Sequence, residues 1–177
     1  YMSSNLTDVE IAASTNILQT SPWDVMDGVK VGSTSNLTNA SGSTFINYLI
    51  DRAPGFMDVV CDTGTGIAHT VTHNLTVIPE FYIRKGRTGG GQNWICYHKD
   101  LGATKGINLN QIWSSYTLST VWSCTAPTAS VFTVGTASVV NSVVNYVTCL
   151  FATLAGVCKV GSYSGCAARG FSDCGFT

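Results

Sequence analysis

The sequence is poor in charged residues, which make up only 11% of its 177 residues. An average soluble domain has about 25%. Helical bundles need Lys and Glu on their solvent faces, so this composition argues against an all-α fold. The net charge is −1, and no basic run is longer than Arg84–Lys85, so we expect no nucleic-acid partner. No apolar stretch reaches the roughly 18 residues that span a membrane.

The sequence also lacks the common motifs of catalysis and metal binding. It contains no G-x-S-x-G, H-E-x-x-H, Walker or C-x-x-C motif. Its seven cysteines are an odd number, which does not suit a disulfide framework. His69 and His73 fall in an expected strand and turn rather than on one helix face, so they are a poor metal pair. We interpret His73 as a turn histidine that bonds a backbone carbonyl, not as a catalytic base. The expected protein has no catalytic residues, no metal and no cofactor.

What the sequence does contain is a series of short apolar or alternating runs bounded by Gly, Asn and Pro. Such runs recur about every 10–12 residues, a spacing typical of β-sandwiches and barrels. The stretch 110–122 is expected to be a loop or an edge strand, Arg87–Gln92 a hairpin loop, and 6–18 one or two helical turns at most. The expected strands are Asp27–Gly32, Thr44–Arg52, Gly55–Asp62, Ala68–His73, Pro79–Lys85, Asn93–His98, Gly106–Asn110, Val131–Gly135, Val143–Ala152 and Gly156–Tyr163.

Two parts of the chain resemble each other at a constant offset of 101 residues. The segment 44–56 aligns with 145–157, so that Leu49 matches Leu150 and Gly55 matches Gly156. Such an offset indicates an internal repeat. We therefore predict an all-β protein, an antiparallel and jelly-roll-like β-sandwich built from repeats of about 101 residues. The predicted domains are 1–66, the C-terminal part of one repeat; 67–168, one full repeat; and 169–177, the start of another. If these boundaries are right, we expect the chain to be one part of a longer polypeptide.

The central segment adds a family resemblance. Residues 67–85, IAHTVTHNLTVIPEFYIRK, continue through a Gly-rich loop into NWICYHKDLGATK at 93–105. This order of "H-x-L-x-x-x-P", an apolar run ending in Lys, and "W-x-x-Y-H" resembles a repeat domain of tailed-bacteriophage tail-fibre and virion-appendage proteins. The resemblance covers essentially the whole chain and implies a structural component of the virion. It supplies no catalytic residues, and the cysteine content departs from the pattern.

Three functions remain open from the sequence. The first is a tail-fibre or appendage segment, located in the virion and partnered by itself, as a homo-oligomer with a trimer as the expected symmetry, and by other virion proteins. The second is a carbohydrate-binding module for host attachment. The third is a capsid decoration or head-fibre protein. Sugar sites combine exposed aromatic side chains with polar neighbours. The candidate glycan or receptor contacts are Arg87, Gln92, Trp94, Tyr97, Trp113 and Tyr116.

Overall fold

The structure is a computed structural model that describes residues 2, 6–10, 39–46 and 48–165. Contacts within the chain divide it into two units, and Met2–Val9 together with Asp51–Thr177 form the larger one. All described strands lie in this larger unit. The strand predicted at Asp27–Gly32 and most of the predicted helical turns at 6–18 lie outside the described residues.

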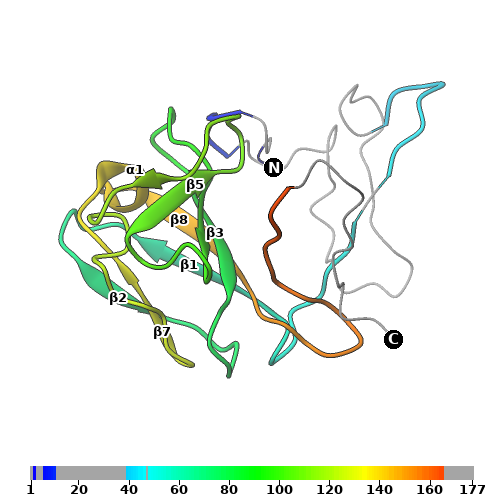
Figure 1. The fold of residues 1–177 in the computed structure, drawn as a ribbon. Coiled ribbons are helices and arrows are strands. Elements are labelled where there is room, and N and C mark those ends of the chain that lie inside the picture. The colour runs from blue at the N-terminus through cyan, green and yellow to red at the C-terminus, as the bar shows by residue number, and fades with distance from the viewer. Residues whose placement is uncertain (1, 3–5, 11–38, 47, 166–177) are drawn as a thin grey trace. The chain divides into compact units, whose positions relative to one another are not determined.

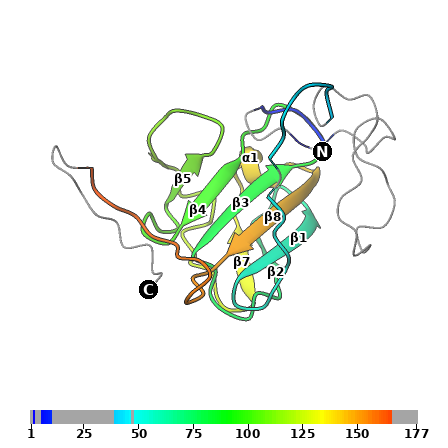
Figure 2. The same ribbon diagram turned by 90° about the vertical axis from the view of Figure 1, so that its right-hand side faces the viewer.

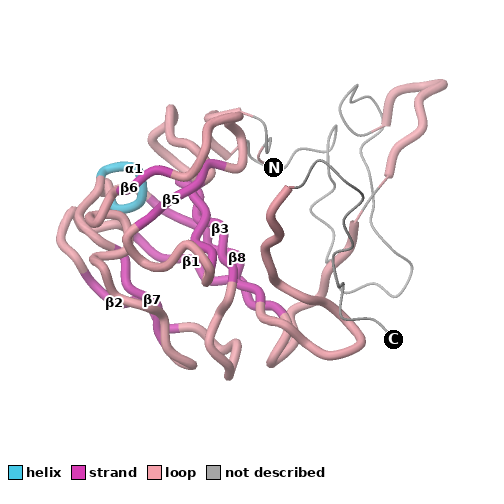
Figure 3. Tube along the Cα trace, in the orientation of Figure 1, coloured by secondary structure: helices cyan, strands magenta, loops and turns pink. Residues whose placement is uncertain are grey.

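The larger unit is all-β apart from one four-residue helix (Figures 1 and 3). Most of its strands begin and end within a few residues of the positions expected from the sequence. The short helix α1 lies between two of the expected strands, Val131–Gly135 and Val143–Ala152. The elements are β1 (Met57–Thr63), β2 (His69–Thr72), β3 (Phe81–Gly86), β4 (Ile95–His98), β5 (Lys105–Asn108), β6 (Tyr116–Thr117), β7 (Val131–Val134), α1 (Ser138–Asn141) and β8 (Asn145–Phe151).

The strands form two antiparallel sheets. One has six strands in the order β1-β8-β3-β4-β5-β6, and the other pairs β2 with β7. Figure 2 shows the large sheet face-on, with the smaller sheet behind it. Since β1 pairs with β8 along its whole length, the large sheet crosses the predicted domain boundary between residues 66 and 67. The division into six and two strands also differs from the two equal sheets of a jelly roll.

Successive side chains of a strand point to opposite sides of the sheet. The strand register therefore shows which residues share a face of the large sheet. Tyr82 lies opposite Tyr97 on β4 and Leu150 on β8, and all three side chains are buried. We call this side, toward β2 and β7, the inner face. Phe81 lies opposite His98 and Phe151 on the other side, which we call the outer face.

Aromatic side chains fill the space between the two sheets. The Tyr82 ring stacks on Tyr97 at 4.5 Å between ring centroids and meets the edge of Trp122 at 4.9 Å. Phe132 of β7 completes the group, 5.2 Å from Tyr82. Such offset and edge-to-face pairs add stabilisation beyond area burial. Trp122 is the largest fully buried side chain, although it comes from a loop.

Within this core the Tyr82 hydroxyl has no hydrogen-bond partner among the described residues. Burial raises the pKa of Tyr82 well above its ordinary value, so the group stays a neutral, unsatisfied hydroxyl. An unpaired buried polar group costs about 1–3 kcal/mol. We therefore expect Tyr82→Phe to leave the free energy of unfolding unchanged or raise it by up to about 1 kcal/mol. Urea unfolding followed by fluorescence measures this, and a loss above 1 kcal/mol would contradict the assignment.

The inner face also carries a buried ion pair. Arg84 is fully buried and donates to both carboxylate oxygens of Asp62, at 2.7 and 2.8 Å. It also donates to the Thr148 hydroxyl and the Val140 carbonyl, and its guanidinium lies 4.1 Å above the Tyr146 ring. These contacts give every nitrogen of the guanidinium a hydrogen-bond partner. They also connect β1, β3, β8 and the α1 region.

Two predicted strands are wrong over the described residues. Residues 44–46 and 48–52 form no strand, and 156–163 form only a turn and an irregular segment. A strand exists only where a neighbour accepts its ladder of hydrogen bonds. The segment 145–151 has neighbours on both sides as β8, whereas no pairing is assigned to its sequence counterpart at 44–50 in the described part of the chain.

The two segments nevertheless end in the same turn. Ala53 and Met57 form an isolated antiparallel bridge, and so do Leu154 and Cys158, 101 positions later. In both turns two hydrogen bonds of 3.0 Å close the bridge. Gly55 and Gly156, the matched glycines, have φ of +77° and +75°, a left-handed conformation that favours glycine. The local backbone therefore repeats at the offset of the sequence.

Candidate functional site

The outer face of the large sheet is unusually apolar for a face that is only partly buried. An antiparallel sheet with one wet face normally alternates apolar and polar residues. Here most outer positions of β1, β3 and β8 are apolar and only partly buried, and the buried Lys85 of β3, opposite Val147, is a charged exception. The apolar positions include Val59 on β1, Phe81 and Ile83 on β3, and Val147, Cys149 and Phe151 on β8.

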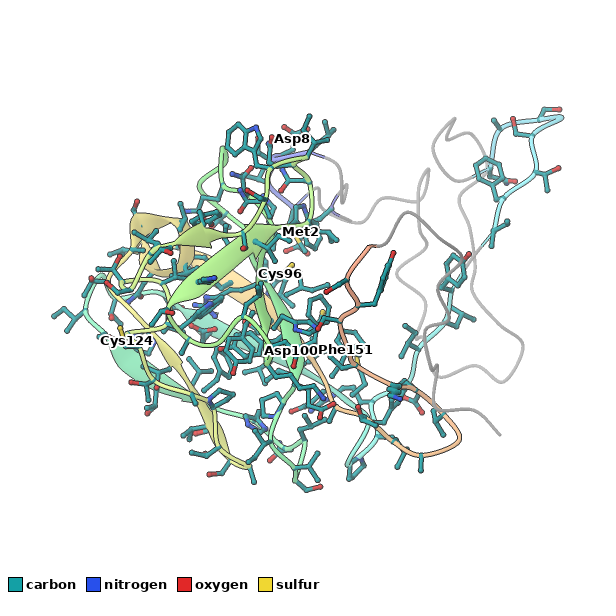
Figure 4. All side chains as sticks on the ribbon, viewed as in Figure 1. Met2, Asp8, Cys96, Asp100, Cys124 and Phe151 are labelled. Atoms are coloured by element: carbon teal, nitrogen blue, oxygen red, sulfur yellow. The ribbon has the colours of Figure 1, made fainter. Side chains whose placement is uncertain are left out.

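A pocket of about 460 Å³ lies at the β4–β5 end of the outer face. This volume is in the range of small-molecule sites. Figure 4 labels two of its residues, Cys96 and Asp100. Strand residues, the turn after β4 and one residue following β8 make its wall: Phe81, Cys96, His98, Asp100, Leu101, Ile107, Asn108, Leu109 and Ser162.

The polar groups of the pocket hold one another in place. The Ser162 hydroxyl donates to Asp100 Oδ2 at 2.6 Å, and the Asp100 amide donates to His98 Nδ1 at 3.2 Å. Since Nδ1 accepts this bond, the neutral ring carries its hydrogen on Nε2. Asp100 is therefore bonded to the serine while the histidine accepts from backbone. The serine is not activated by the histidine, so this is not the relay of a serine hydrolase.

Cys96 does not supply a nucleophile to the pocket. Burial raises the pKa of its thiol to about 12, and a hydrogen bond with the Leu109 backbone lowers it only partly. The reactive species is the thiolate, which is scarce at neutral pH for this group. Cys96 therefore acts as a small apolar wall residue.

The cysteines should consequently react in a fixed order. Cys61 and Cys124 are exposed, whereas Cys96 is buried and its thiol pKa is about 12. We expect iodoacetamide at pH 8 to modify Cys61 and Cys124 at least about 100-fold faster than Cys96. Peptide mass mapping against time measures this, and labelling in urea is the control. Equal rates in the folded protein would contradict the burial of Cys96.

The predicted contact residues lie in different surroundings. Tyr97 is only 4% exposed and stacks in the core, so its prediction as a ligand contact is wrong. Tyr97 is a core aromatic. Arg87 Nη1 lies 3.9 Å from Cys61 Sγ, beside β1, and Gln92 donates to the Ser138 carbonyl at 3.4 Å. Trp94 is partly buried, and its Nε1 donates to the Leu6 carbonyl at 3.1 Å.

Trp113 is the one predicted contact residue that is widely exposed, at 65%. It lies in the loop between β5 and β6 next to the fully exposed Ile112, which the sequence analysis did not single out. The base of this loop is fixed because Asn110 donates to Asn93 at 3.0 Å and accepts from the Trp94 amide. Tyr116, at the end of the loop, is half-buried and donates to Asn108 at 3.2 Å.

The remaining buried ionisable groups serve the backbone. His73 Nε2 bonds the Thr128 carbonyl at 3.1 Å while its Nδ1 accepts from the Leu75 amide, which confirms the turn-histidine interpretation. Burial acts to raise the pKa of Asp58. Hydrogen bonds from the Asn74 amide, Arg52 and the Val59 amide outweigh that effect and lower it. Asp58 thus stays ionised as a backbone acceptor.

Two further findings concern the described residues alone. They hold no group of three or more His, Cys, Asp or Glu side chains placed to share a metal ion. No helix within them is both long and apolar enough to cross a membrane.

Residues 49–177 match the family described as a domain of unknown function, DUF7483. The chain belongs to this family. No curated protein matches it, and no solved structure does. The matched range contains the turn at 53–57, all described strands, the outer-face pocket and the second turn at 154–158. The features described above are therefore located within the family domain.

The pocket residues were missed because no local motif joins them. They come from three strands, a turn and a segment after β8. A signal for the outer face did exist in the sequence, since Phe81-Tyr82-Ile83 and Ile95-Cys96-Tyr97 are apolar at successive positions. Such runs indicate strands contacted on both faces.

Proposed function

We propose that this chain is a non-enzymatic structural module of a bacteriophage virion, a β-repeat segment of a tail fibre or similar appendage. The repeated turn at 53–57 and 154–158 is the observation that carries the proposal. Repeat proteins stack units that bury faces left apolar on each one. The apolar outer face of the large sheet and the low charge of the chain suit such stacking.

The repeat is proposed with a shifted boundary. A unit cut at the turns runs from Met57 to Val157 and contains all the described strands. Segment 44–56 would then end one unit, and the chain after Cys158 would begin another. We propose that each unit is a β-sandwich, with the β2–β7 sheet as its second layer. The jelly-roll-like arrangement of its strands is part of the same proposal.

The absence of an enzymatic role is part of the same proposal. It is supported by the hydrogen bonds and ion pairs that four ionisable side chains make within the fold. Asp58 and His73 bond backbone groups, Asp62 neutralises the buried Arg84, and Asp100 is bonded by Ser162. Each of these four side chains thus helps to position the chain.

The test begins with the chain itself and ends with the particle. Sedimentation velocity of the isolated chain should show association that increases with concentration. A cryo-EM reconstruction of intact virions should then place the domain in a projecting fibre or in the baseplate. Density on the capsid surface would favour a decoration or head-fibre protein instead. A chain that stays monomeric at all concentrations and is absent from purified particles would overturn the proposal.

A host-attachment role is the second candidate, and the exposed Trp113 favours it. An indole face next to polar side chains is a common platform for a sugar ring. The fixed base of the loop, through Asn93 and Asn110, would hold that platform in one orientation. A glycan array with wild type and Trp113→Ala tests this role. Binding that is lost in the variant supports it, and an array without hits removes it.

A further inference from the structure

We propose that loop 109–112 of one repeat unit binds, through its main chain, to Lys85 and Trp94 of the next unit along the polypeptide. The inference rests on the proposed repeat and names a contact between successive units. It starts from a contact that the structure contains. The N-terminal segment 6–9 belongs to the larger unit of the chain and is held there by two side chains, Lys85 and Trp94, which we call the clasp.

The clasp binds carbonyl oxygens of the segment. Lys85 Nζ donates to the Thr7 carbonyl at 2.9 Å and to the Gln92 carbonyl at 2.7 Å, and Trp94 Nε1 donates to the Leu6 carbonyl at 3.1 Å. Lys85 is only 1% exposed, and an ammonium taken out of water needs such acceptors. A segment at the position of residues 6 and 7 is therefore part of the surroundings that keep Lys85 charged.

The clasped segment has a counterpart further along the sequence. At an offset of 103 residues Val31-Gly32 aligns with Val134-Gly135, and at the same offset NLTDV at 5–9 aligns with NLNQI at 108–112. The first two residues are identical, and Val9 and Ile112 are both β-branched. Segment 6–9 thus takes the place of loop 109–112 in the unit before, and its binding to the clasp is a contact between two units of the proposed repeat.

Loop 109–112 presents the matching residues to solvent. Leu109 is 50% exposed and Ile112 is fully exposed, and Figure 2 shows the loop that follows β5 as an arch. Ile112 is the counterpart of Val9, whose Cγ1 lies 3.6 Å from the position of a Cβ built on Gly90. Large apolar side chains exposed close together mark an interaction site. Binding to a clasp would give Ile112 the contact that Val9 has.

Trp94 takes part in both contacts. Its carbonyl accepts from the Leu109 amide of its own unit at 2.9 Å, whereas its indole donates to Leu6. Each unit therefore offers a loop and a clasp, so the same contact can recur along a row of units that touch only their neighbours. The exposure of the loop is consistent with this arrangement, because the clasp beside it is already occupied by segment 6–9.

One feature of the clasped segment does not carry over. Burial lowers the pKa of Lys85, and the Asp8 carboxylate opposes that change. The counterpart of Asp8 is the uncharged Gln111. The contact between units would therefore depend on the carbonyls of residues 109 and 110 and on the Ile112 side chain.

A directional cross-link tests the contact. The full chain is extended by a second copy of residues 57–157 placed directly after Val157, which keeps the 101-residue period. Ile112→Cys in the first unit and Gly90→Cys in the second should form a disulfide, since the Val9 contact at 3.6 Å brings the two positions within its reach. Peptide mapping after mild oxidation identifies the 90–112 link.

The matched control reverses the two changes, with Gly90→Cys in the first unit and Ile112→Cys in the second. It contains the same cysteines but offers the loop to no following clasp, so no 90–112 link is expected. Val9→Cys with Gly90→Cys in the unextended chain is the positive control. Gly90 has φ of +58°, and the strain of a cysteine there is common to all three variants.

A second measurement uses the unextended chain. The triple variant Thr7→Asn, Asp8→Gln and Val9→Ile gives the N-terminal segment the sequence of the loop. Deuterium exchange of the Trp94 indole N–H, followed by NMR, should stay within about twofold of wild type. Val9→Asp should accelerate it at least about tenfold, because a carboxylate replaces the apolar contact at Gly90 and the segment opens more often.

The outcomes separate this inference from the proposed function. A 90–112 link in the forward arrangement alone supports the contact. A link in neither arrangement or in both, or a triple variant that exchanges as fast as Val9→Asp, overturns it. A missing 9–90 link in the positive control also overturns it, because the starting contact is then absent. The virion role is tested separately by association of the chain and its place in the particle, and a forward link in a protein absent from particles removes that role alone.

Discussion

Replacing Arg84 with Met should lower the free energy of unfolding by about 3–5 kcal/mol. The methionine fills similar space but leaves the Asp62 carboxylate and the Val140 carbonyl without the partner that they have at 2.7 and 2.8 Å. A buried charge that loses its partner costs much more than the intact pair contributes. Urea unfolding of the variant measures the effect.

Two comparisons make this prediction specific. Lys99→Met removes a cation that also pairs with a carboxylate, Glu80, in an ion pair whose side chains are 37% and 25% exposed. Exposed ion pairs contribute at most about 1 kcal/mol, so this control should change little. The double variant Arg84→Met with Asp62→Asn should lose less than the sum of the two single losses, since the orphaned charge is gone. Additive losses would show that Arg84 and Asp62 do not act as a pair.

Trp122→Ala should be about as damaging, at about 3–5 kcal/mol. The indole is fully buried, makes T-shaped contacts with Tyr82 and Tyr97, and donates to the Lys105 carbonyl at 3.1 Å. Its removal opens a cavity between the sheets and leaves that carbonyl without its bond. Urea unfolding with near-UV circular dichroism measures both the stability and the loss of aromatic packing.

Trp113→Ala is the matched control for this second prediction. It makes the same chemical change in a loop of the same unit, at a side chain that is 65% exposed. The expected change in the free energy of unfolding is within about 0.5 kcal/mol. If both tryptophans cost the same, the core described between the two sheets is not the main source of stability.

The strands that could be predicted are those whose boundaries are marked by nearby residues in the sequence. Pro79, placed just before β3, and the glycines that follow it delimit an alternating run, and β1, β4, β7 and β8 are marked in the same way. Pairing is not local, which is why segment 44–50 was expected to be a strand on the same pattern as β8. The residue pattern makes a segment able to pair, but the segment becomes a strand only when a neighbouring strand is there to accept its hydrogen bonds.

Trp122 shows a second limit of sequence reasoning. Its surroundings are rich in Ser and Thr, so the stretch up to it was expected to be a loop or an edge strand, and β6 with the turns that follow agrees. The indole is nonetheless the centre of the core, because the chain turns sharply after it. Ser123 and Cys124 both have positive φ, 53° and 52°. Such a conformation is rare for residues other than glycine and leaves no pattern in the sequence.

In the candidate site, too, residues with a local role could be predicted from the sequence, and residues brought together by the fold could not. His73 was interpreted correctly because a histidine beside Asn in a turn has a local role. The outer-face pocket depends on residues brought together from β3, β4 and β5, and their contact follows from strand order, which sequence periodicity does not contain. Tyr97 is predicted from the sequence as a ligand contact, but its register opposite Tyr82 places it in the core.

Lys85 and Trp94 bind the N-terminal segment through its main chain, so these contacts do not depend on which side chains that segment carries. Lys85 Nζ donates to the Thr7 carbonyl at 2.9 Å, and Trp94 Nε1 donates to the Leu6 carbonyl at 3.1 Å. Both contacts are to the main chain, which every amino acid provides. The side chains at positions 6 and 7 can therefore vary while these hydrogen bonds persist, but a change at Lys85 or Trp94 removes a bond to the N-terminal segment whatever residues it carries.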